Sequence, residues 1–270
     1  MISLTPARTN PIGTLTDFWL FAILAATGLA TGTLTGLTGA SGMSVLISML
    51  LLAKIPIREV IGLTFVITLV NSVIASAFYW RHGRVDVRSG CFVALPAMAS
   101  VLVGNLFSQT IKTNALTMVM VVSLFAIGIK FLLAPEEKIE SDANGGSSSC
   151  PDAFPLVLLG VVSGLVMGVM GGGGAMFIGI ALIVLLKFET KTAIGTSILI
   201  MGLAAIPGVV SHWRGGTLQW NYALVILSCS IPATACGSWF ANRISARDVK
   251  RLLGCYLVVI APILLYRIVL

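Results

Sequence analysis

A glycine-rich segment occurs twice in this chain, each time between two apolar runs. The first copy carries Gly32, Gly36, Gly39 and Gly42, and an offset of 132 residues places these glycines on Gly164, Gly168, Gly171 and Gly174. Beyond the glycines the offset becomes 133, and it pairs Lys54 with Lys187, Gly62 with Gly195, Thr64 with Ser197, and Trp80 with Trp213. Because so many ordered matches rarely arise by chance, we interpret the chain as an internal duplication.

Long apolar runs predict that the chain folds in a membrane. Hydrophobic residues make up 57% of the 270 residues, charged residues make up 10%, and the mean hydropathy is +1.01. Such values are unusual for a water-soluble domain. Residues 60–79 and 114–134 each provide the roughly 20 apolar residues that a helix needs to cross the hydrocarbon core. We therefore expect an all-α polytopic membrane protein, and we do not expect its net charge of +7 to bind nucleic acid.

The duplication predicts two homologous halves, residues 1–133 and 154–270. A polar segment at 134–153, rich in Gly, Ser and acidic residues, is typical of a flexible linker. Each half should hold about five apolar segments, of which the second is too short to cross a membrane alone. The expected segments are 18–31, 43–53, 58–80, 89–108 and 114–133, and then 154–170, 175–186, 192–211, 219–241 and 248–270.

Two topologies are compatible with these segments. The halves are inverted if each short segment counts as a separate pass, and parallel if each glycine break interrupts one crossing. The inverted arrangement puts eleven Lys and Arg residues on one face against six, and the parallel arrangement splits them nine to eight. Because cytoplasmic loops collect Lys and Arg, we prefer an inverted repeat in the plasma membrane, with the linker in the cytoplasm.

The two glycine breaks predict the position of a substrate site. Irregular backbone inside a bilayer survives only where it is buried in protein or lines a wet cavity. Short helices that start at Gly42 and Gly174 would direct unpaired N–H groups and the positive ends of their dipoles into the membrane, which suits an anion. Interrupted helices at matching positions of two halves are typical of transporter substrate sites. In contrast, the four-residue spacing of Gly28, Gly32 and Gly36 predicts close helix packing.

Hydroxyl and amide groups near the breaks complete the predicted site. Ser and Thr can donate hydrogen bonds to an oxyanion, and a buried amide in an apolar helix needs partners. The predicted substrate-binding residues are Gly39, Ser41, Gly42, Thr64, Asn71, Gly171, Gly172, Gly173, Gly174, Thr196 and Ser197. Thr35 is a further candidate donor near the first break. A Leu at position 42 or 173 is expected to occupy the space of the anion while the protein still folds.

Patterns for catalysis, metals and cofactors are missing from the sequence. The run at Gly171 lacks the Lys and Ser or Thr that follow in a phosphate-binding loop. No charged residue lies near the centre of an apolar run, so a proton relay through a carboxylate is not predicted. The five cysteines show no metal-binding spacing and are expected to be small buried hydrophobes. We predict a protein that is not an enzyme and that binds no cofactor, no metal and no nucleic acid.

The order of these motifs resembles the TauE/SafE family of sulfite and organosulfonate exporters. The resemblance rests on the glycine-rich segments, the Lys54-Ile55-Pro56 turn, the Gly62-Leu63-Thr64 stretch, and the Trp80-Arg81 pair before Gly83, with their repeats in the second half. It covers nearly the whole chain from about residue 20. It implies a plasma-membrane permease that moves small sulfur-containing oxyanions such as sulfite or sulfoacetate, usually outward. It also implies that the glycines of both breaks, Thr64, Thr196 and Ser197 contact the substrate.

Two other functions stay open at this point. A passive anion channel would use the same residues as a permease but would not occlude its substrate. A membrane protein that handles a sulfur metabolite through a cysteine, such as Cys91 or Cys229, is the second alternative. The expected partners are a small anion and the lipid bilayer, and the sequence leaves the oligomeric state open.

Overall fold

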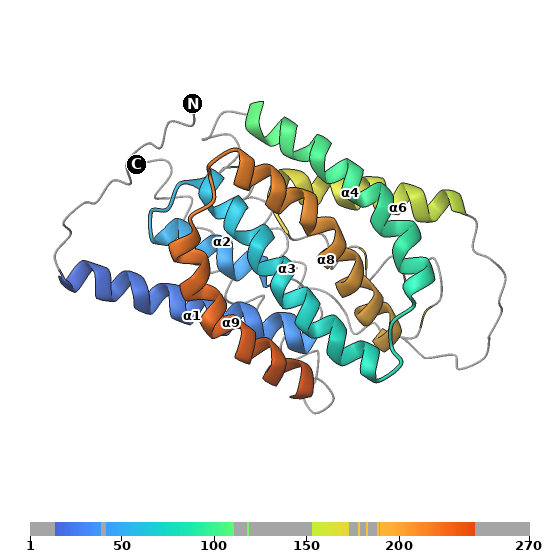
Figure 1. The fold of residues 1–270 in the computed structure, drawn as a ribbon, viewed down its shortest axis with the longest axis horizontal. Helices are drawn as coiled ribbons and strands as arrows, with labels where there is room; N and C mark the ends of the chain where they lie inside the picture. Colours follow the sequence, from blue (N-terminus) through green and yellow to red (C-terminus); the bar gives the residue numbers. More distant parts are fainter. Residues whose placement is uncertain are drawn as a thin grey trace.

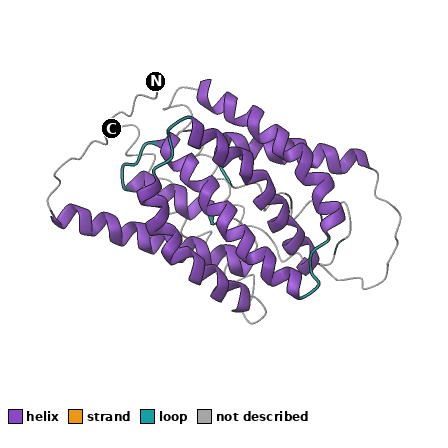
Figure 2. Ribbon diagram, viewed as in Figure 1, coloured by secondary structure: helices purple, strands orange, loops and turns teal. Residues whose placement is uncertain are grey.

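The computed structural model describes residues 14–38, 42–110, 153–172 and 190–240, together with Met118, Ile178, Leu182 and Phe188. Every regular element in this part of the chain is a helix (Figure 2). The helices are α1 (Thr14–Thr38), α2 (Met43–Leu52), α3 (Ile57–Arg81), α4 (Val87–Thr110), α6 (Ala153–Met170), α8 (Thr190–Arg214) and α9 (Trp220–Phe240). Five of them are long and apolar enough to cross a membrane, which confirms the expected all-α polytopic architecture.

Several expected segments cannot be compared with the structure. The helices expected at 114–133 and 248–270, the linker at 134–153 and the short segment at 175–186 lie outside the described residues, apart from single positions. In the first half, α2 and α3 begin and end within two residues of the expected positions.

Helices α3 and α8 pack against each other at the centre of the bundle (Figure 1). Each has 25 residues, and the offset of 133 places one on the other from end to end. Gly62 of α3 lies against His212 near one end of this interface, and Gly195 of α8 lies against Tyr79 near the other. The two matching helices therefore run antiparallel.

A glycine stripe on α1 packs against α9, and a matching stripe on α6 packs against α4. In each case the missing side chain leaves space that a backbone carbonyl of the partner helix occupies. Gly28, Gly32 and Gly36 face the carbonyls of Ile226, Ser230 and Thr234, and Gly160, Gly164 and Gly168 face those of Val93, Ala97 and Val101. Close approach of two helix backbones is what this spacing of small residues permits.

This packing corrects the expected end of the first helix. The sequence suggested that it ends at residue 31, before the first of the clustered glycines. That expectation was wrong, because α1 continues through Gly32 and Gly36 to Thr38. Glycine lowers helix propensity by about 1 kcal/mol, but here the contact with α9 favours the helical conformation.

The contacts between helices also give their directions. Successive glycines of α1 meet successively later residues of α9, so α1 and α9 are parallel, and α6 and α4 are parallel for the same reason. Asn71 contacts Ser230, and Glu59 contacts Gln219, so α3 runs with α9. Gly90 contacts Thr196, and Asn105 contacts Ser211, so α4 runs with α8. The described helices α1, α3 and α4 thus run opposite to α6, α8 and α9 at the matching positions of the second half. An inverted repeat produces this arrangement, although the duplication itself stays an interpretation.

Helices α3 and α8 end in the same backbone motif. Gly83 and Gly216 have positive φ angles of 67° and 66°. The residue after each glycine donates a hydrogen bond to the carbonyl five residues earlier, from Arg84 N to Tyr79 O at 3.0 Å and from Thr217 N to His212 O at 3.2 Å. Glycine adopts this left-handed conformation without steric cost, which makes it the usual residue after a helix end.

The outer surface of the bundle is apolar, as a lipid-facing surface requires. Large side chains such as Leu95, Leu106 and Phe154 are exposed there. Cys91 and Cys236 are also exposed, which corrects the expectation that the cysteines are buried, whereas Cys150 and Cys255 lie outside the described residues. A cysteine on a surface that faces lipid packs as an apolar residue would, which explains its place in the apolar runs.

Candidate functional site

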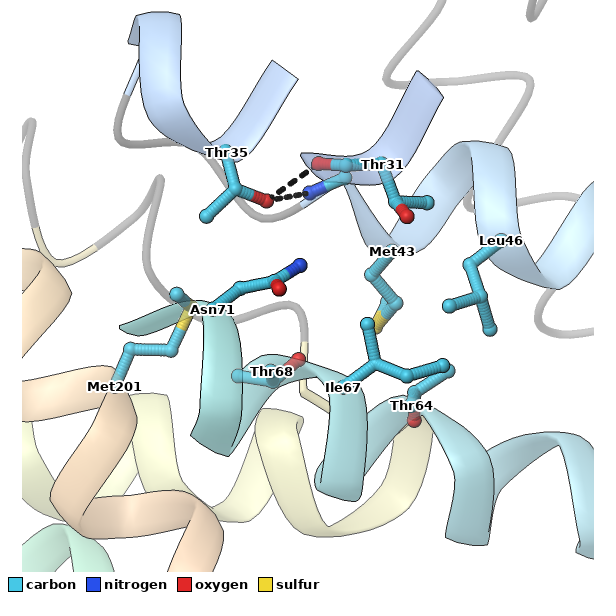
Figure 3. A pocket seen from close by; sticks show the side chains of 10 residues that line it. Thr31, Thr35, Met43, Leu46, Thr64, Ile67, Thr68, Asn71 and Met201 are labelled. Carbon is cyan, nitrogen blue, oxygen red and sulfur yellow. Dashed lines mark hydrogen bonds between the residues drawn. The ribbon is translucent and has the colours of Figure 1, made fainter. Parts of the chain in front are cut away.

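A small cavity lies at the centre of the bundle, where α1, α2, α3 and α8 meet (Figure 3). Its walls are formed by Thr31, Thr35, Gly42, Met43, Leu46, Thr64, Ile67, Thr68, Asn71 and Met201. The centre of a water molecule has only about 10 Å³ of room in it, roughly what a single buried water needs. The structure therefore shows this site in a closed form.

The first glycine break forms one wall of the cavity. Gly42 caps the N-terminus of α2, and its N–H donates to Thr35 Oγ1 at 3.2 Å. Thr35 in turn donates to the carbonyl of Thr31 at 2.8 Å, and Figure 3 shows both bonds converging on its hydroxyl. The start of α2 is thus held near the C-terminal end of α1, with its N-terminal end at the cavity.

Gly42 has a different role from the one expected. A Cβ atom built on Gly42 would come within 2.6 Å of the Thr31 Cα atom. A Leu at position 42 would therefore collide with the backbone of α1, so the expectation that it fills the anion's space in a folded protein is not supported. Gly42 is required for the close contact of α1 and α2.

The second glycine break contacts α3, which forms part of the wall of the same cavity. Gly171 has a positive φ of 83°, and α6 ends just before it at Met170. The N–H of Gly172 donates to Thr64 Oγ1 at 3.4 Å, and the missing side chain of Gly172 leaves room for the Thr68 hydroxyl. Because Thr64 and Thr68 line the cavity, α3 connects the second break with the site.

Asn71 supplies the amide group of the site. It lies near the middle of α3 and is 1% exposed. Its Oδ1 atom accepts a hydrogen bond of 3.1 Å from Ser230 Oγ on α9, which leaves its amide hydrogens for the cavity. Figure 3 shows the side-chain nitrogen directed towards Thr31 and Thr35. This bond to Ser230 fixes the orientation of the amide, as a buried polar group requires.

The structure brings together some predicted residues and separates others. Gly42, Thr64 and Asn71 line the cavity, and Gly171 and Gly172 contact its wall. Thr196 and Ser197 do not line it. The Thr196 hydroxyl accepts from the N–H of Asp86 at 3.0 Å, before α4, and Ser197 donates to Ile194 O at 2.9 Å within its own helix. Gly39, Ser41, Gly173 and Gly174 lie outside the described residues.

Several lining residues were missed in the sequence. Thr64, Thr68 and Asn71 follow one another at intervals of four and three residues, so they share a helix face. That spacing was a usable signal for Thr68. No comparable signal exists for Met43 and Met201, because a methionine in an apolar helix is ordinary.

The polar groups that line the cavity are uncharged. Its polar lining groups are neutral hydroxyls and an amide, and none of its lining side chains is charged. Oriented neutral donors stabilise an oxyanion strongly in a site that excludes water. They hold it less tightly than a buried Lys or Arg would, which favours release.

Comparison with known proteins gives a consistent result. Residues 24–263 match the family model described as sulfite exporter TauE/SafE. The chain is 23% identical to the probable membrane transporter protein YunE of Bacillus subtilis, over 91% of this chain and 94% of the relative. It is 25% identical to the probable membrane transporter protein YjnA of the same organism, over 86% of this chain and 94% of that protein. No solved structure matches the chain.

The extent of these matches agrees with the architecture. The family match covers both halves of the chain, including both glycine breaks and the residues that line the cavity. The relatives are named as membrane transporters, in agreement with five apolar helices long enough to cross a membrane. The chain is therefore a multi-pass membrane transporter that belongs to the sulfite exporter TauE/SafE family.

Proposed function

We propose that this transporter carries a small sulfur-containing oxyanion, such as sulfite or sulfoacetate, out of the cell across the plasma membrane. The central cavity is the proposed substrate site. The observation that carries this proposal is the convergence of Thr35, Thr68 and Asn71 with the N-terminal end of α2 on one cavity at mid-bundle. The Thr68 hydroxyl, the Asn71 amide and the backbone N–H groups at the start of α2 are the proposed donors for the anion, whereas the Thr35 hydroxyl donates to Thr31 O and holds the start of α2 in place. The family description supports sulfite as a member of the substrate class.

The transport cycle needs at least one further conformation. A cavity with room for about one water molecule is too small for sulfite, so substrate can bind only after the walls separate. In the proposed cycle the helices of one half rock against those of the other around the fixed site, as in other transporters with inverted repeats. The interface between α3 and α8 opens alternately towards each face of the membrane.

We propose that the turn after α3 lies in the cytoplasm. Arg81, Arg84 and Arg88 lie at this end of the bundle, at the end of α3 and the start of α4. Counted over the whole sequence, the same face receives eleven of the seventeen Lys and Arg residues, together with the linker at 134–153. The rule that positive loops stay inside supports this orientation.

The experiment is transport by the full-length protein in liposomes. Radiolabelled sulfite, sulfoacetate and sulfate are offered separately, and protein-free liposomes measure leakage. Saturable movement of sulfite or sulfoacetate supports the proposal. Absence of movement for every sulfur oxyanion rejects it, and single-channel currents in a planar bilayer identify a channel instead of a permease.

A further inference from the structure

His212 is a buried titratable group that the proposed substrate site does not use. It lies in the last turn of α8, where it is 5% exposed. Its ring packs against Gly62 and Phe65 of α3, with a ring centroid distance of 5.7 Å to Phe65. Phe65 directly follows Thr64, which lines the cavity. His212 therefore lies in the interface between α3 and α8, the interface that opens in the proposed transport cycle.

The hydrogen bonds of His212 define its tautomer. Thr217 Oγ1 donates its only hydrogen to the His212 carbonyl at 3.3 Å. We assign Nδ1 as the donor in the 2.8 Å bond to Thr217 Oγ1, because this tautomer satisfies both hydrogen bonds and leaves Nε2 with its lone pair. Nε2 is buried and has no hydrogen-bond partner among the described residues. The ring is neutral in this conformation, because a protonated Nε2 would bury an N–H without an acceptor.

The matching position of the first half holds a residue of different chemistry. The offset of 133 places His212 on Tyr79, and it places Gly62 on Gly195, the glycine against which Tyr79 packs. A phenol takes up no proton near neutral pH, whereas an imidazole does. Of the matched residues Tyr79 and His212, only His212 can therefore change its charge by protonation near neutral pH.

The described helices place few charged groups near His212. On α3 they are Arg58 and Glu59, and Glu59 is hydrogen-bonded to Gln219 at the start of α9. On α8 itself the nearby charge is Arg214, and the described part of α4 carries only Arg88, at its opposite end. Glu59 is the only acidic residue within α3, α4, α8 and α9, and His212 is the only histidine in these helices, with a buried Nε2 atom that has no partner among the described residues.

We infer that His212 is a proton-binding site that couples the movement of substrate to the movement of protons. This inference rests on the proposed function. In the closed form the imidazole is neutral and its Nε2 lone pair is shielded. When α3 and α8 separate, water reaches Nε2, which accepts a proton to form an imidazolium ion. Because the open form binds the proton more tightly than the closed form, proton binding and opening are thermodynamically linked.

The test measures substrate and protons together. Full-length protein is placed in liposomes that contain a pH-sensitive dye, and radiolabelled 2-hydroxyethanesulfonate is the probe, because its charge does not change with pH in the working range. His82 is the other histidine of the chain and provides the matched control, since it is exposed and its Nδ1 bonds to Phe78 O. Wild-type and His82→Gln proteins should move protons with the sulfonate. His212→Gln should move sulfonate without protons.

Each outcome separates this inference from the proposed function. If the wild-type protein moves neither the sulfonate nor sulfite, the proposed function fails, and the coupling fails with it. If sulfonate moves without protons in the wild type, or with protons in His212→Gln, only the role of His212 is overturned. Should His212→Gln fail to fold, His212→Tyr replaces it, because Tyr79 already packs against a glycine at the matching position.

A second measurement requires no change at His212. In His82→Gln protein, His212 is the only imidazole. Nitrogen-15 spectra should show the neutral ring protonated at Nδ1 in the absence of substrate, and an imidazolium signal that grows when sulfonate and acid are added together. A spectrum that is the same with and without sulfonate at every pH contradicts the inference.

Discussion

The two halves of the bundle share their helix packing but differ at the cavity. The contacts of Gly28, Gly32 and Gly36 are repeated, position for position, by Gly160, Gly164 and Gly168. The lining residues do not repeat in this way. Thr68 matches Met201, Asn71 matches Ala204, and Thr35 matches Met167. The first half thus contributes the hydroxyls and the amide of the cavity lining, whereas the described part of the second half contributes only Met201.

The difference shows which features each half must retain. A helix pair in close backbone contact tolerates no side chain at the contact, so both halves keep the glycines. A substrate site at the interface of two halves needs only one set of donors, and the other half can supply apolar walls. The described lining of the cavity is therefore asymmetric. The following variants exchange features between the halves, from the largest expected effect to the smallest.

Replacement of the central glycine of either stripe should have the largest effect. In Gly32→Leu and Gly164→Leu the new side chain meets the carbonyl of Ser230 or of Ala97, and we expect a loss of about 3 kcal/mol or more from overpacking. Thermal unfolding in detergent measures the loss. Ala26→Leu, at an exposed position of α1, is the control. If only one of the glycine variants is destabilised, the packing of the halves is not equivalent.

Thr68→Met makes the first half resemble the second at the cavity. The variant loses a hydroxyl that faces the cavity, and the larger Met side chain fills part of the cavity. We therefore expect kcat/KM to fall about 10- to 100-fold, the effect of a lost hydrogen bond to a charged group. Uptake of radiolabelled sulfite by liposomes gives this ratio. Thr33→Met is the control, because the Thr33 hydroxyl bonds only within its own helix. Unchanged kinetics in Thr68→Met would remove Thr68 from the site.

Asn71→Ala introduces the residue found at the matching position of the second half, Ala204, and should reduce transport less than Thr68→Met does. The cavity loses an amide donor, and the Ser230 hydroxyl loses its acceptor. We expect transport to fall about tenfold and the protein to lose about 1 kcal/mol of stability, typical of one buried hydrogen bond. A double-mutant cycle with Ser230→Ala separates the two effects. Additive losses of stability would contradict the observed bond between Asn71 and Ser230.

Met201→Thr gives the second half the polar residue of the first and should have the smallest effect. The change adds a hydroxyl and some space, so transport of sulfite should change less than about tenfold. Sulfate has one more oxygen than sulfite, and we expect it to compete with sulfite better in Met201→Thr than in the wild-type protein. Competition against radiolabelled sulfite measures this preference, and Met98→Thr on α4 is the control. An unchanged ranking of anions would show that Met201 does not determine selectivity.

Much of the fold was predictable because its determinants are local. Apolar runs of membrane-spanning length identified α3, α4, α8 and α9 within a few residues. The end of α1 was not predictable, because Gly32 and Gly36 favour a break until α9 packs against them. Lining residues of the cavity were predictable where a backbone break or a single amide in an apolar helix identified them, as at Gly42 and Asn71. The role of Thr196 was not predictable, because hydroxyls on a helix look alike until their neighbours are known.

The sequence by itself determined that the chain lies in a membrane and that motifs of its first half recur in the same order in its second half. These properties follow from hydrophobicity and local backbone preference, which act over a few residues. Only the tertiary structure decided that Thr68 and Met201 face one cavity and that the Thr196 hydroxyl accepts from the N–H of Asp86 before α4. It also decided that the Nε2 atom of His212 has no hydrogen-bond partner among the described residues. These properties depend on contacts between helices far apart in the chain, because the packing of the helices decides which face of each one is enclosed.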